Sequence, residues 1–307
     1  MEKNITVIIP HKDIPNILLK CIDSIPFRTD VEIIVIDDNS NDKNKVILKA
    51  LNRTNLKVIY TTESKGAGYA RNRGIDEAQG KWLLFADADD YFHSLAFDFF
   101  DEYLDSKLDL IHFNQEGRFL NTEKYSNRAE QFSKLINKYI LDPSPKNLEI
   151  IKYCMHTPYV KMIKKSLVEA NNIRFDECIG SNDVMFSTLV GHFTNKISVD
   201  KRVAYFVNVR AGSLTKTRSI ENAYSRFWVW VRYNKFMVEN EKPNFQVLLL
   251  SRVFQSLIYF GFSDFKRYIL FAKKMKVNLY VKGYLLFFSA YNYIISVLKI
   301  DKFLIKE

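Results

Sequence analysis

The chain has 307 residues, of which 47% are hydrophobic and 26% charged, a composition that excludes disordered and fibrous proteins and predicts a globular fold. Its net charge is +10, and its three cysteines (Cys21, Cys154 and Cys178) form no CxxC pair, so we expect neither a disulfide framework nor a cysteine zinc site. The N-terminus enters an apolar run within a few residues, which leaves no room for a secretory signal, so we expect a cytoplasmic protein.

Strands and helices alternate through the N-terminal part of the chain. Apolar runs at 5–9, 31–36, 56–60 and 82–85 predict four strands, and the segments between them predict helices. The second run is apolar almost throughout, which suits a strand covered on both faces, as in a parallel sheet. We therefore predict an α/β fold with a mainly parallel, Rossmann-like sheet flanked by helices.

Polar residues follow three of these strands. Pro10 ends the first, Asp38 lies just after the second, and Asp87 and Asp89 follow the fourth. Because ligands of such sheets bind outside the carboxyl ends of the strands, we expect these residues to converge on one crevice. Two carboxylates separated by one residue can hold a divalent cation and leave coordination sites for phosphate. Taken alone, however, each cluster is more typical of a turn or a helix cap.

The second half of the chain is less regular. Residues 111–209 show a mixed pattern, in which an acidic turn at 179–183 opens an apolar helix. Beyond residue 222 the chain is predicted to be helical, with Tyr, Phe and Trp interleaved with Lys and Arg. Residues 247–307 carry ten Lys or Arg and three Asp or Glu, so most of the net positive charge lies in this tail.

Four stretches, taken in order, resemble the family 2 glycosyltransferases of the GT-A fold, inverting enzymes that build bacterial polysaccharides. These stretches are VIIPHKD, EIIVIDDNSND, ARNRGIDEAQGKWLLFADADD and GSNDVMF. The resemblance covers residues 4 to about 215 and implies a GT-A catalytic domain at 1–220, followed by a helical, aromatic and basic region at 221–307. It implies transfer of one sugar from a nucleotide-diphosphate sugar, by family habit a UDP-sugar, to a hydroxyl of a glycan or an undecaprenyl-type lipid-linked acceptor. The product would be a surface polysaccharide such as capsule or the O-antigen of lipopolysaccharide.

The resemblance also implies roles for individual residues. Asp38 would hold the base or ribose, Asp87 and Asp89 would form the DxD motif that binds Mn²⁺ or Mg²⁺, and Asp183 would be the general base. The other residues implied in the nucleotide-sugar site are Pro10, His11, Asp13, Gly66, Arg71 and Ala88. The loop residues that would contact the diphosphate are Arg210, Lys216 and Arg218. The residues that would shape the acceptor pocket are His156, Lys161 and Asn182. His11 and His156 could equally be loop histidines whose ring nitrogens are hydrogen-bonded within the protein.

Two departures from the family pattern affect these expectations. Asn182 stands where the family usually has Glu, so one acceptor-binding carboxylate is missing. No QxxRW motif of the processive synthases follows Asp183, which favours transfer of a single sugar. A catalytically silent scaffold of a polysaccharide assembly complex is the alternative from another functional class. Region 221–307 has two open interpretations: an interfacial helix on the cytoplasmic face of the inner membrane, or packing and self-association. No nucleic-acid partner is expected.

Overall fold

The computed structural model describes residues 2–120, 122, 124–209, 219–277 and 279. The chain forms two compact units, Met1–Thr217 and Arg218–Glu307. The first unit is a mixed α/β fold, and the described part of the second is helical. The predicted α/β class with a C-terminal helical region is therefore confirmed.

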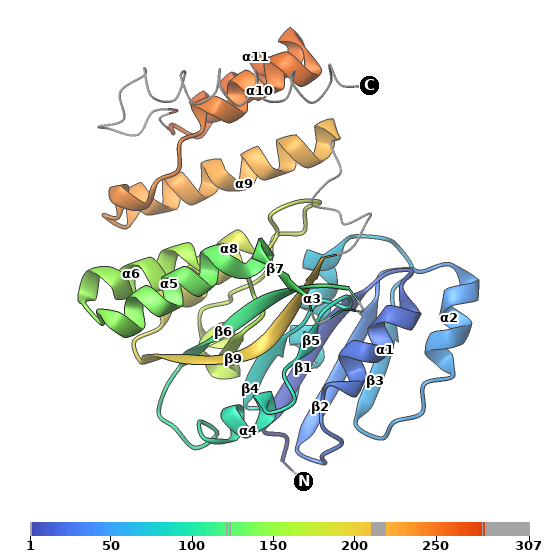
Figure 1. The fold of residues 1–307 in the computed structure, drawn as a ribbon. Helices are drawn as coiled ribbons and strands as arrows, with labels where there is room; N and C mark the ends of the chain where they lie inside the picture. Colours follow the sequence, from blue (N-terminus) through green and yellow to red (C-terminus); the bar gives the residue numbers. More distant parts are fainter. Residues whose placement is uncertain (1, 121, 123, 210–218, 278, 280–307) are drawn as a thin grey trace. The chain divides into compact units, whose positions relative to one another are not determined.

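One sheet runs through the described residues of the first unit (Figure 1). Its strand order is β3-β2-β1-β4-β8-β6-β9-β5, and β7 pairs with β6 outside this path. The first four strands are parallel to one another, whereas β8 is antiparallel to both β4 and β6. The strands are β1 (Ile5–His11), β2 (Val31–Asp37), β3 (Leu56–Tyr60), β4 (Trp82–Phe85), β5 (Tyr91–Phe92), β6 (Leu110–Phe119), β7 (Tyr125–Ser126), β8 (Lys161–Lys164) and β9 (Ile197–Val209).

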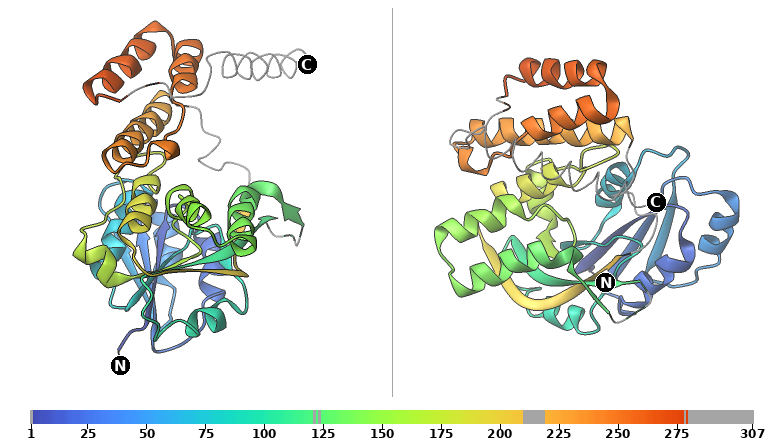
Figure 2. Two further views of the ribbon diagram at one scale, coloured as in Figure 1. Left: turned by 90° about the vertical axis from the view of Figure 1, so that its left-hand side faces the viewer. Right: turned by 45° about the horizontal axis from the view of Figure 1, so that its top comes forward.

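Helices cover both faces of this sheet (Figures 1 and 2). The short α4 and the 3-10 helix η1 belong to the part of the chain that follows the fourth strand. The helices are α1 (Pro15–Asp23), α2 (Asp42–Lys49), α3 (Ala67–Glu77), α4 (Ala96–Asp101), η1 (Asn127–Ala129), α5 (Glu130–Leu141), α6 (Pro145–Cys154), α7 (Lys165–Ala170) and α8 (Val184–Phe193).

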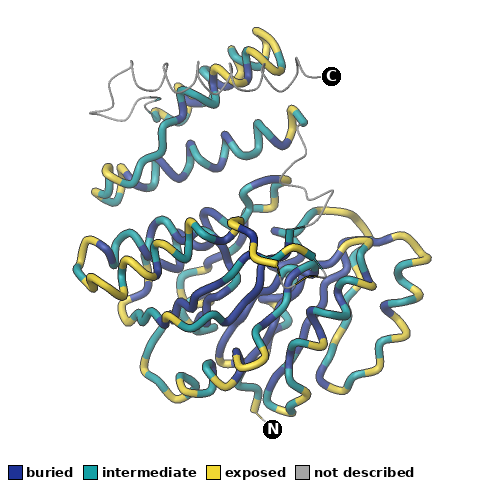
Figure 3. Tube along the Cα trace, viewed as in Figure 1, coloured by how far each residue is buried: buried dark blue, intermediate teal, exposed yellow. Residues whose placement is uncertain are grey.

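Two apolar clusters, one on each face, explain why the parallel strands are apolar throughout. Successive side chains of a strand point to opposite faces. Val7 of β1 accordingly joins a cluster with Leu18 of α1, whereas the next residue, Ile8, joins a cluster with Ala70 of α3 and Phe186 of α8. Figure 3 shows the central strands as a nearly continuous buried layer. Both faces are therefore excluded from water, as expected for a parallel sheet.

The first strand is longer than predicted, because it continues through Pro10 to His11. The carbonyl of Ile8 accepts from Ala86 on the β4 side, and the carbonyl of His11 accepts from Asp38 on the β2 side. Since backbone groups alternate along a strand, the missing N–H of Pro10 faces β4. The proline therefore ends the pairing with β4, while the pairing with β2 continues.

The described part of the second unit consists of packed helices with an aromatic core. Phe227 stacks on Tyr268 with ring centroids 4.4 Å apart, and Trp230 meets Tyr233 edge-on at 5.2 Å. Among the described helices, none combines the length and apolarity that crossing a bilayer requires. Of region 221–307, for which an interfacial helix was one interpretation, residues 278 and 280–307 lie outside the described residues. The helices are α9 (Ile220–Glu239), the 3-10 helix η3 (Pro243–Phe245), α10 (Leu250–Phe260) and α11 (Phe262–Lys274).

Candidate active site

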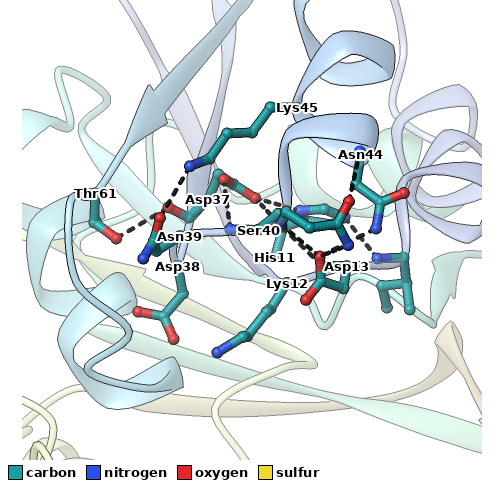
Figure 4. A network of polar contacts seen from close by, with 12 residues as sticks. His11, Lys12, Asp13, Asp37, Asp38, Asn39, Ser40, Asn44, Lys45 and Thr61 are labelled. Carbon is teal, nitrogen blue, oxygen red and sulfur yellow. Dashed lines mark hydrogen bonds and ion pairs between the residues drawn. The ribbon is translucent and has the colours of Figure 1, made fainter.

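A buried hydrogen-bond network joins the loops after β1 and β2 (Figure 4). His11 Nε2 accepts from the backbone N–H of Ile14 at 3.1 Å, so Nδ1 carries the proton and donates to Asp37 Oδ1 at 2.9 Å. Ser40 donates its hydroxyl and its backbone N–H to the same carboxylate. Burial would raise the pKa of Asp37, but the hydrogen bonds from His11 and Ser40 outweigh it and lower that pKa. Asp37 is therefore an internal anchor of both loops.

His11 requires a correction to its expected role. It was predicted to contact the nucleotide sugar, but it is 2% exposed and both of its ring nitrogens are hydrogen-bonded inside the protein. Its polar atoms therefore order the loops that surround the site. The neighbouring Pro10 is only half-buried.

Asp13 and Asp38 each tie two loops together. Asp13 has a left-handed backbone (φ 56°), and its carboxylate accepts from Asn41, whose backbone N–H lowers the pKa of Asp13. Asp38 accepts from the backbone N–H groups of Lys65 and Gly66, at 2.8 and 2.9 Å. In Figure 4 its side chain points away from the buried Asp37. Asp38 thus connects the loop after β2 to the start of α3, and its binding of a nucleotide stays a prediction.

Arg71 connects three parts of the fold. From α3, it donates to Asp87 Oδ1 at 2.6 Å and to Asn182 Oδ1 at 2.8 Å, and its guanidinium carbon lies 5.2 Å from the centroid of the Phe175 ring. The Arg71 side chain is 7% exposed and that of Asp87 is 33% exposed, so the ion pair is shielded from water on the arginine side and open on the aspartate side. Asp87 follows β4 and Asn182 immediately precedes Asp183. Arg71 therefore brings the acidic loop and the predicted base-bearing turn together.

Three carboxylates gather in the loop after β4. Oxygen atoms of Asp87, Asp89 and Asp90 all lie within 4.8 Å of one another, and this is the group of potential metal ligands found among the described residues. Asp90 is 3% exposed; burial first, and then the charges of Asp89 and Asp87, raise its pKa well above its usual value. Carboxylate oxygens are the ligands that Mg²⁺ and Mn²⁺ prefer, so the side chains present fit such an ion.

Strand β9 fixes the conformation of this acidic loop. The backbone N–H of Asn208 donates to Asp90 at 2.7 Å, its side-chain amide donates to the carbonyl of Asp89 at 2.6 Å, and the Tyr205 hydroxyl accepts from the backbone N–H of Asp87 at 2.9 Å. No role for Asp90, Asn208 or Tyr205 was predicted from the sequence. Asp90 was visible in the DADD string, whereas nothing local to residues 205–208 indicates a partner more than a hundred positions away.

The acidic turn before α8 carries Asp183. Ser181 has a positive φ of 62°, a left-handed conformation that is strained for serine. Burial raises the pKa of Asp183, and the positive charge of Arg71 opposes this shift. The turn packs against the start of α3 at Gly68, where an added Cβ would lie 2.1 Å from the carbonyl oxygen of Asp176. A carboxylate whose pKa is raised is a stronger base once it is ionised, which suits proton abstraction.

The three expected acceptor residues have different environments. Lys161 requires a correction: it is 1% exposed, and its ammonium donates to the carbonyl of Met155 at 2.5 Å, so it does not form a surface for an acceptor. Burial lowers the pKa of His156 to about 4, and its carbonyl accepts from Ser187. Asn182 receives the hydrogen bond from Arg71 described above. The expected diphosphate-binding residues Arg210, Lys216 and Arg218 lie outside the described residues.

Comparison with known proteins decides the family. The family model described as glycosyl transferase family 2 matches residues 6–169. This chain belongs to glycosyl transferase family 2. The match contains the loop that carries Asp38, the helix α3 that carries Arg71, and the acidic loop after β4.

Relatives of this glycosyltransferase come from several bacteria. The glycosyltransferase GlyA of Streptococcus pneumoniae is 26% identical over 70% of this chain and 32% of its own length. The poly(ribitol-phosphate) β-N-acetylglucosaminyltransferase TarS of Staphylococcus aureus is 28% identical over 58% of this chain and 30% of its own length. The chain thus spans about a third of the length of either relative.

Solved structures show that the fold is GT-A. Residues 1–349 of S. aureus TarS in complex with UDP-GlcNAc superpose with a TM-score of 0.67 at 21% identity, covering 89% of this chain and 80% of that one. The mannosyltransferase PcManGT of Pyrobaculum calidifontis, in complex with GDP-Man and Mn²⁺, gives a TM-score of 0.54 at 15% identity and covers all of this chain and 89% of its own. The predicted GT-A fold and family are therefore both confirmed.

Proposed function

We propose that this family 2 glycosyltransferase moves one sugar from a UDP-sugar to a hydroxyl of a bacterial cell-surface glycan or of its lipid-linked precursor, with inversion at the anomeric carbon. The main support is the position of Arg71, whose guanidinium bonds both Asp87 of the acidic loop and Asn182 beside Asp183. Sugar transfer from a nucleotide diphosphate needs the acidic loop, which would face the diphosphate, and Asp183, the proposed base, within one site. UDP is favoured because a relative of the same fold, TarS, binds UDP-GlcNAc.

The proposed roles follow from the geometry of the acidic loop and the turn before α8. Asp87 and Asp89 would hold a Mn²⁺ or Mg²⁺ ion, with Asp90 buried behind them. Such an ion would neutralise charge that develops on the departing diphosphate. Asp183 would accept the proton of the acceptor hydroxyl as its oxygen attacks the anomeric carbon opposite the leaving group. A single displacement inverts that centre.

The acceptor, the C-terminal region and the residues expected to contact the diphosphate stay predictions. Relatives such as TarS act on poly(ribitol-phosphate), which supports a cell-wall or capsular glycan as the acceptor class, without naming the sugar. Contact of residues 221–307 with lipid or with a second copy of the chain also stays a prediction, as does the diphosphate contact expected of Arg210, Lys216 and Arg218, which lie outside the described residues.

A panel of nucleotide sugars tests the proposal against the catalytically silent scaffold. In the presence of Mn²⁺, we expect one UDP-sugar to raise the melting temperature of the protein and to release UDP slowly by hydrolysis. Chelation of Mn²⁺ by EDTA should remove both effects. A scaffold would release no nucleotide from any donor, and this outcome would reject the enzymatic function.

Gly68 provides a structural test of the site. An added Cβ would lie 2.1 Å from the carbonyl oxygen of Asp176, in the loop that precedes Asp183. We expect Gly68→Ala to cost about 1–3 kcal/mol of stability through overpacking, and to abolish the thermal stabilisation by UDP and Mn²⁺ because the turn is displaced from Arg71.

Gly191→Ala is the matched control for this substitution. Its Cβ would meet the carbonyl oxygen of Lys152 at the same distance, 2.1 Å, but in the packing of α8 on α6. It should lose comparable stability and still be stabilised by UDP at a temperature where both variants are folded. Normal UDP binding by a folded Gly68→Ala protein would show that the contact of α3 with the turn is not needed for the site.

A further inference from the structure

Lys161, the first residue of β8, is a charged side chain inside the protein. It is 1% exposed, and burial lowers its pKa to about 7. Burying an ammonium group is costly unless its donors find partners. The Lys161 ammonium donates to the carbonyl of Met155 at 2.5 Å, six residues earlier in the chain. The segment between Met155 and Lys161 is thereby closed into a short loop.

This loop is fixed to the helix that begins at Asp183. The hydroxyl of Ser187 donates to the carbonyl of His156 at 2.7 Å, and the backbone N–H of Ser187 donates to the carbonyl of Asp183 at 2.9 Å. A continuous path of hydrogen bonds and covalent chain therefore runs from Lys161 through Met155 and His156 to the first turn of α8.

The backbone of the loop is strained next to Lys161. Val160 has a φ of 57°, which is an outlier for a β-branched residue in the left-handed region. The preceding residue, Tyr159, stacks on Tyr205 with ring centroids 5.1 Å apart, and Tyr205 itself bonds the acidic loop at Asp87. Strain of this kind persists only where flanking contacts determine the conformation, and it is concentrated at functional sites.

Charged side chains from several elements act electrostatically on Asp183. Arg71 from α3, Asp87 from the loop after β4 and Lys161 from β8 act on it, and Asp183 in turn acts on the buried Tyr159. Arg71 is already bonded to Asp87 and Asn182. Lys161 is a second positive charge, and it helps to hold the pKa of Asp183 down against burial.

Two histidines next to Lys161 do not supply this positive charge. Burial, followed by the charge of Lys161, lowers the pKa of His156 to about 4 and the pKa of His112 well below its usual value. Both rings are therefore neutral near pH 7. Lys161 is accordingly the titratable cation of this cluster.

We propose that Lys161 is a positioning residue for Asp183: from inside the fold it closes the loop whose His156 carbonyl is bonded to Ser187 of α8, and it places a positive charge within electrostatic reach of Asp183. This inference rests on the proposed function, in which Asp183 is the general base. It assigns Lys161 to the base, in place of the acceptor contact expected from the sequence.

The test is the pH dependence of kcat/KM, whose acid limb reports the pKa of the base in the free enzyme. In Lys161→Met the positive charge is lost, so the pKa of Asp183 rises and the acid limb moves to higher pH. Ser187→Ala removes the contact with the loop and keeps the charge; kcat should fall about tenfold with the acid limb unmoved. An acid limb that stays in place in Lys161→Met overturns the proposal.

Lys164→Met is the matched control, because Lys164 lies on the same strand with its ammonium over the Trp82 ring, 5.6 Å from the centroid. It should leave the acid limb unchanged. If Lys161→Met does not melt cooperatively, Lys161→Arg replaces it: the charge is kept, so a displaced acid limb in that variant contradicts the proposal. Full activity of Asp183→Asn would instead reject the proposed role of Asp183 as base. Failure of the proposed function is thereby distinguished from failure of the proposal for Lys161.

Discussion

Replacing Asp183 by Asn is expected to lower kcat for sugar transfer by about 10²–10⁴-fold, the usual contribution of a general base. Asparagine has nearly the same shape but cannot accept the proton of the acceptor hydroxyl. Asp183 lies beside the residue that Arg71 binds and does not belong to the acidic cluster after β4. Stabilisation by UDP and Mn²⁺ should therefore remain close to that of the parent protein.

Asp76→Asn is a suitable control for this experiment. Asp76 lies on α3, 46% exposed at its side chain, in a surface ion pair with Arg174. Such pairs contribute little to stability, so both transfer and UDP binding should be unchanged. Measuring single-turnover transfer and UDP-induced melting shifts on the same preparations separates chemistry from binding. An Asp183→Asn protein that transfers sugar at the parent rate would remove Asp183 from the role of base.

The strands of the parallel half were predictable because their apolar runs end at polar residues or at residues with special backbone preferences. β3 (Leu56–Tyr60) and β4 (Trp82–Phe85) have the predicted bounds. The segment between the second and third strands was predicted to be helical, and helix α2 within it ends at Lys49. Arg53, just beyond it, donates to the carbonyls of Ile22 and Ile25. These tertiary hydrogen bonds hold the loop between α2 and β3 in a non-helical conformation. Local helical preference cannot predict them, because their acceptors lie about thirty residues earlier in the chain.

The carboxylates of Asp37 and Asp38 show what a motif leaves unspecified. Their side chains point in opposite directions (Figure 4), since neighbouring residues at the end of a strand face opposite sides. One carboxylate is enclosed with His11, while the other accepts from Lys65 and Gly66. The strand period alone indicates that only one of them can face the crevice. Which one does so depends on the buried partner, His11, for which a ligand contact and an internal loop position were both open from the sequence.

The supports of the acidic loop were not predictable, because they come from the far end of β9. Tyr205 and Asn208 bond residues 118 positions earlier in the chain. The sequence of 111–209 gives only a mixed pattern, since β6, β8 and β9 combine parallel and antiparallel pairing within one sheet. The roles of individual residues in the candidate site stay predictions, whereas the family and the fold are established.

Asp89→Asn is the second substitution with a large expected effect. Asp89 is half-buried and shares the three-carboxylate cluster with Asp87 and Asp90, whereas Asp90 is buried and bonded to the backbone of Asn208. Replacing Asp89 by Asn removes one anionic oxygen ligand without disturbing that support. We expect transfer to fall by at least about 10²-fold, and a higher Mn²⁺ concentration to be needed for UDP to stabilise the protein.

The metal dependence is measured without turnover, by following the melting temperature during a Mn²⁺ titration at fixed UDP. Asp98→Asn, an exposed substitution in the first turn of α4, is the control and should give the parent titration curve. Asp90→Asn should instead destabilise the protein even without Mn²⁺, because the carboxyl group of Asp90 fixes the loop to β9 through Asn208. If Asp89→Asn and the parent require the same Mn²⁺ concentration, Asp89 is not a metal ligand. The three carboxylates would then serve only to hold the acidic loop in place, through the hydrogen bonds that it forms with Arg71 and with β9.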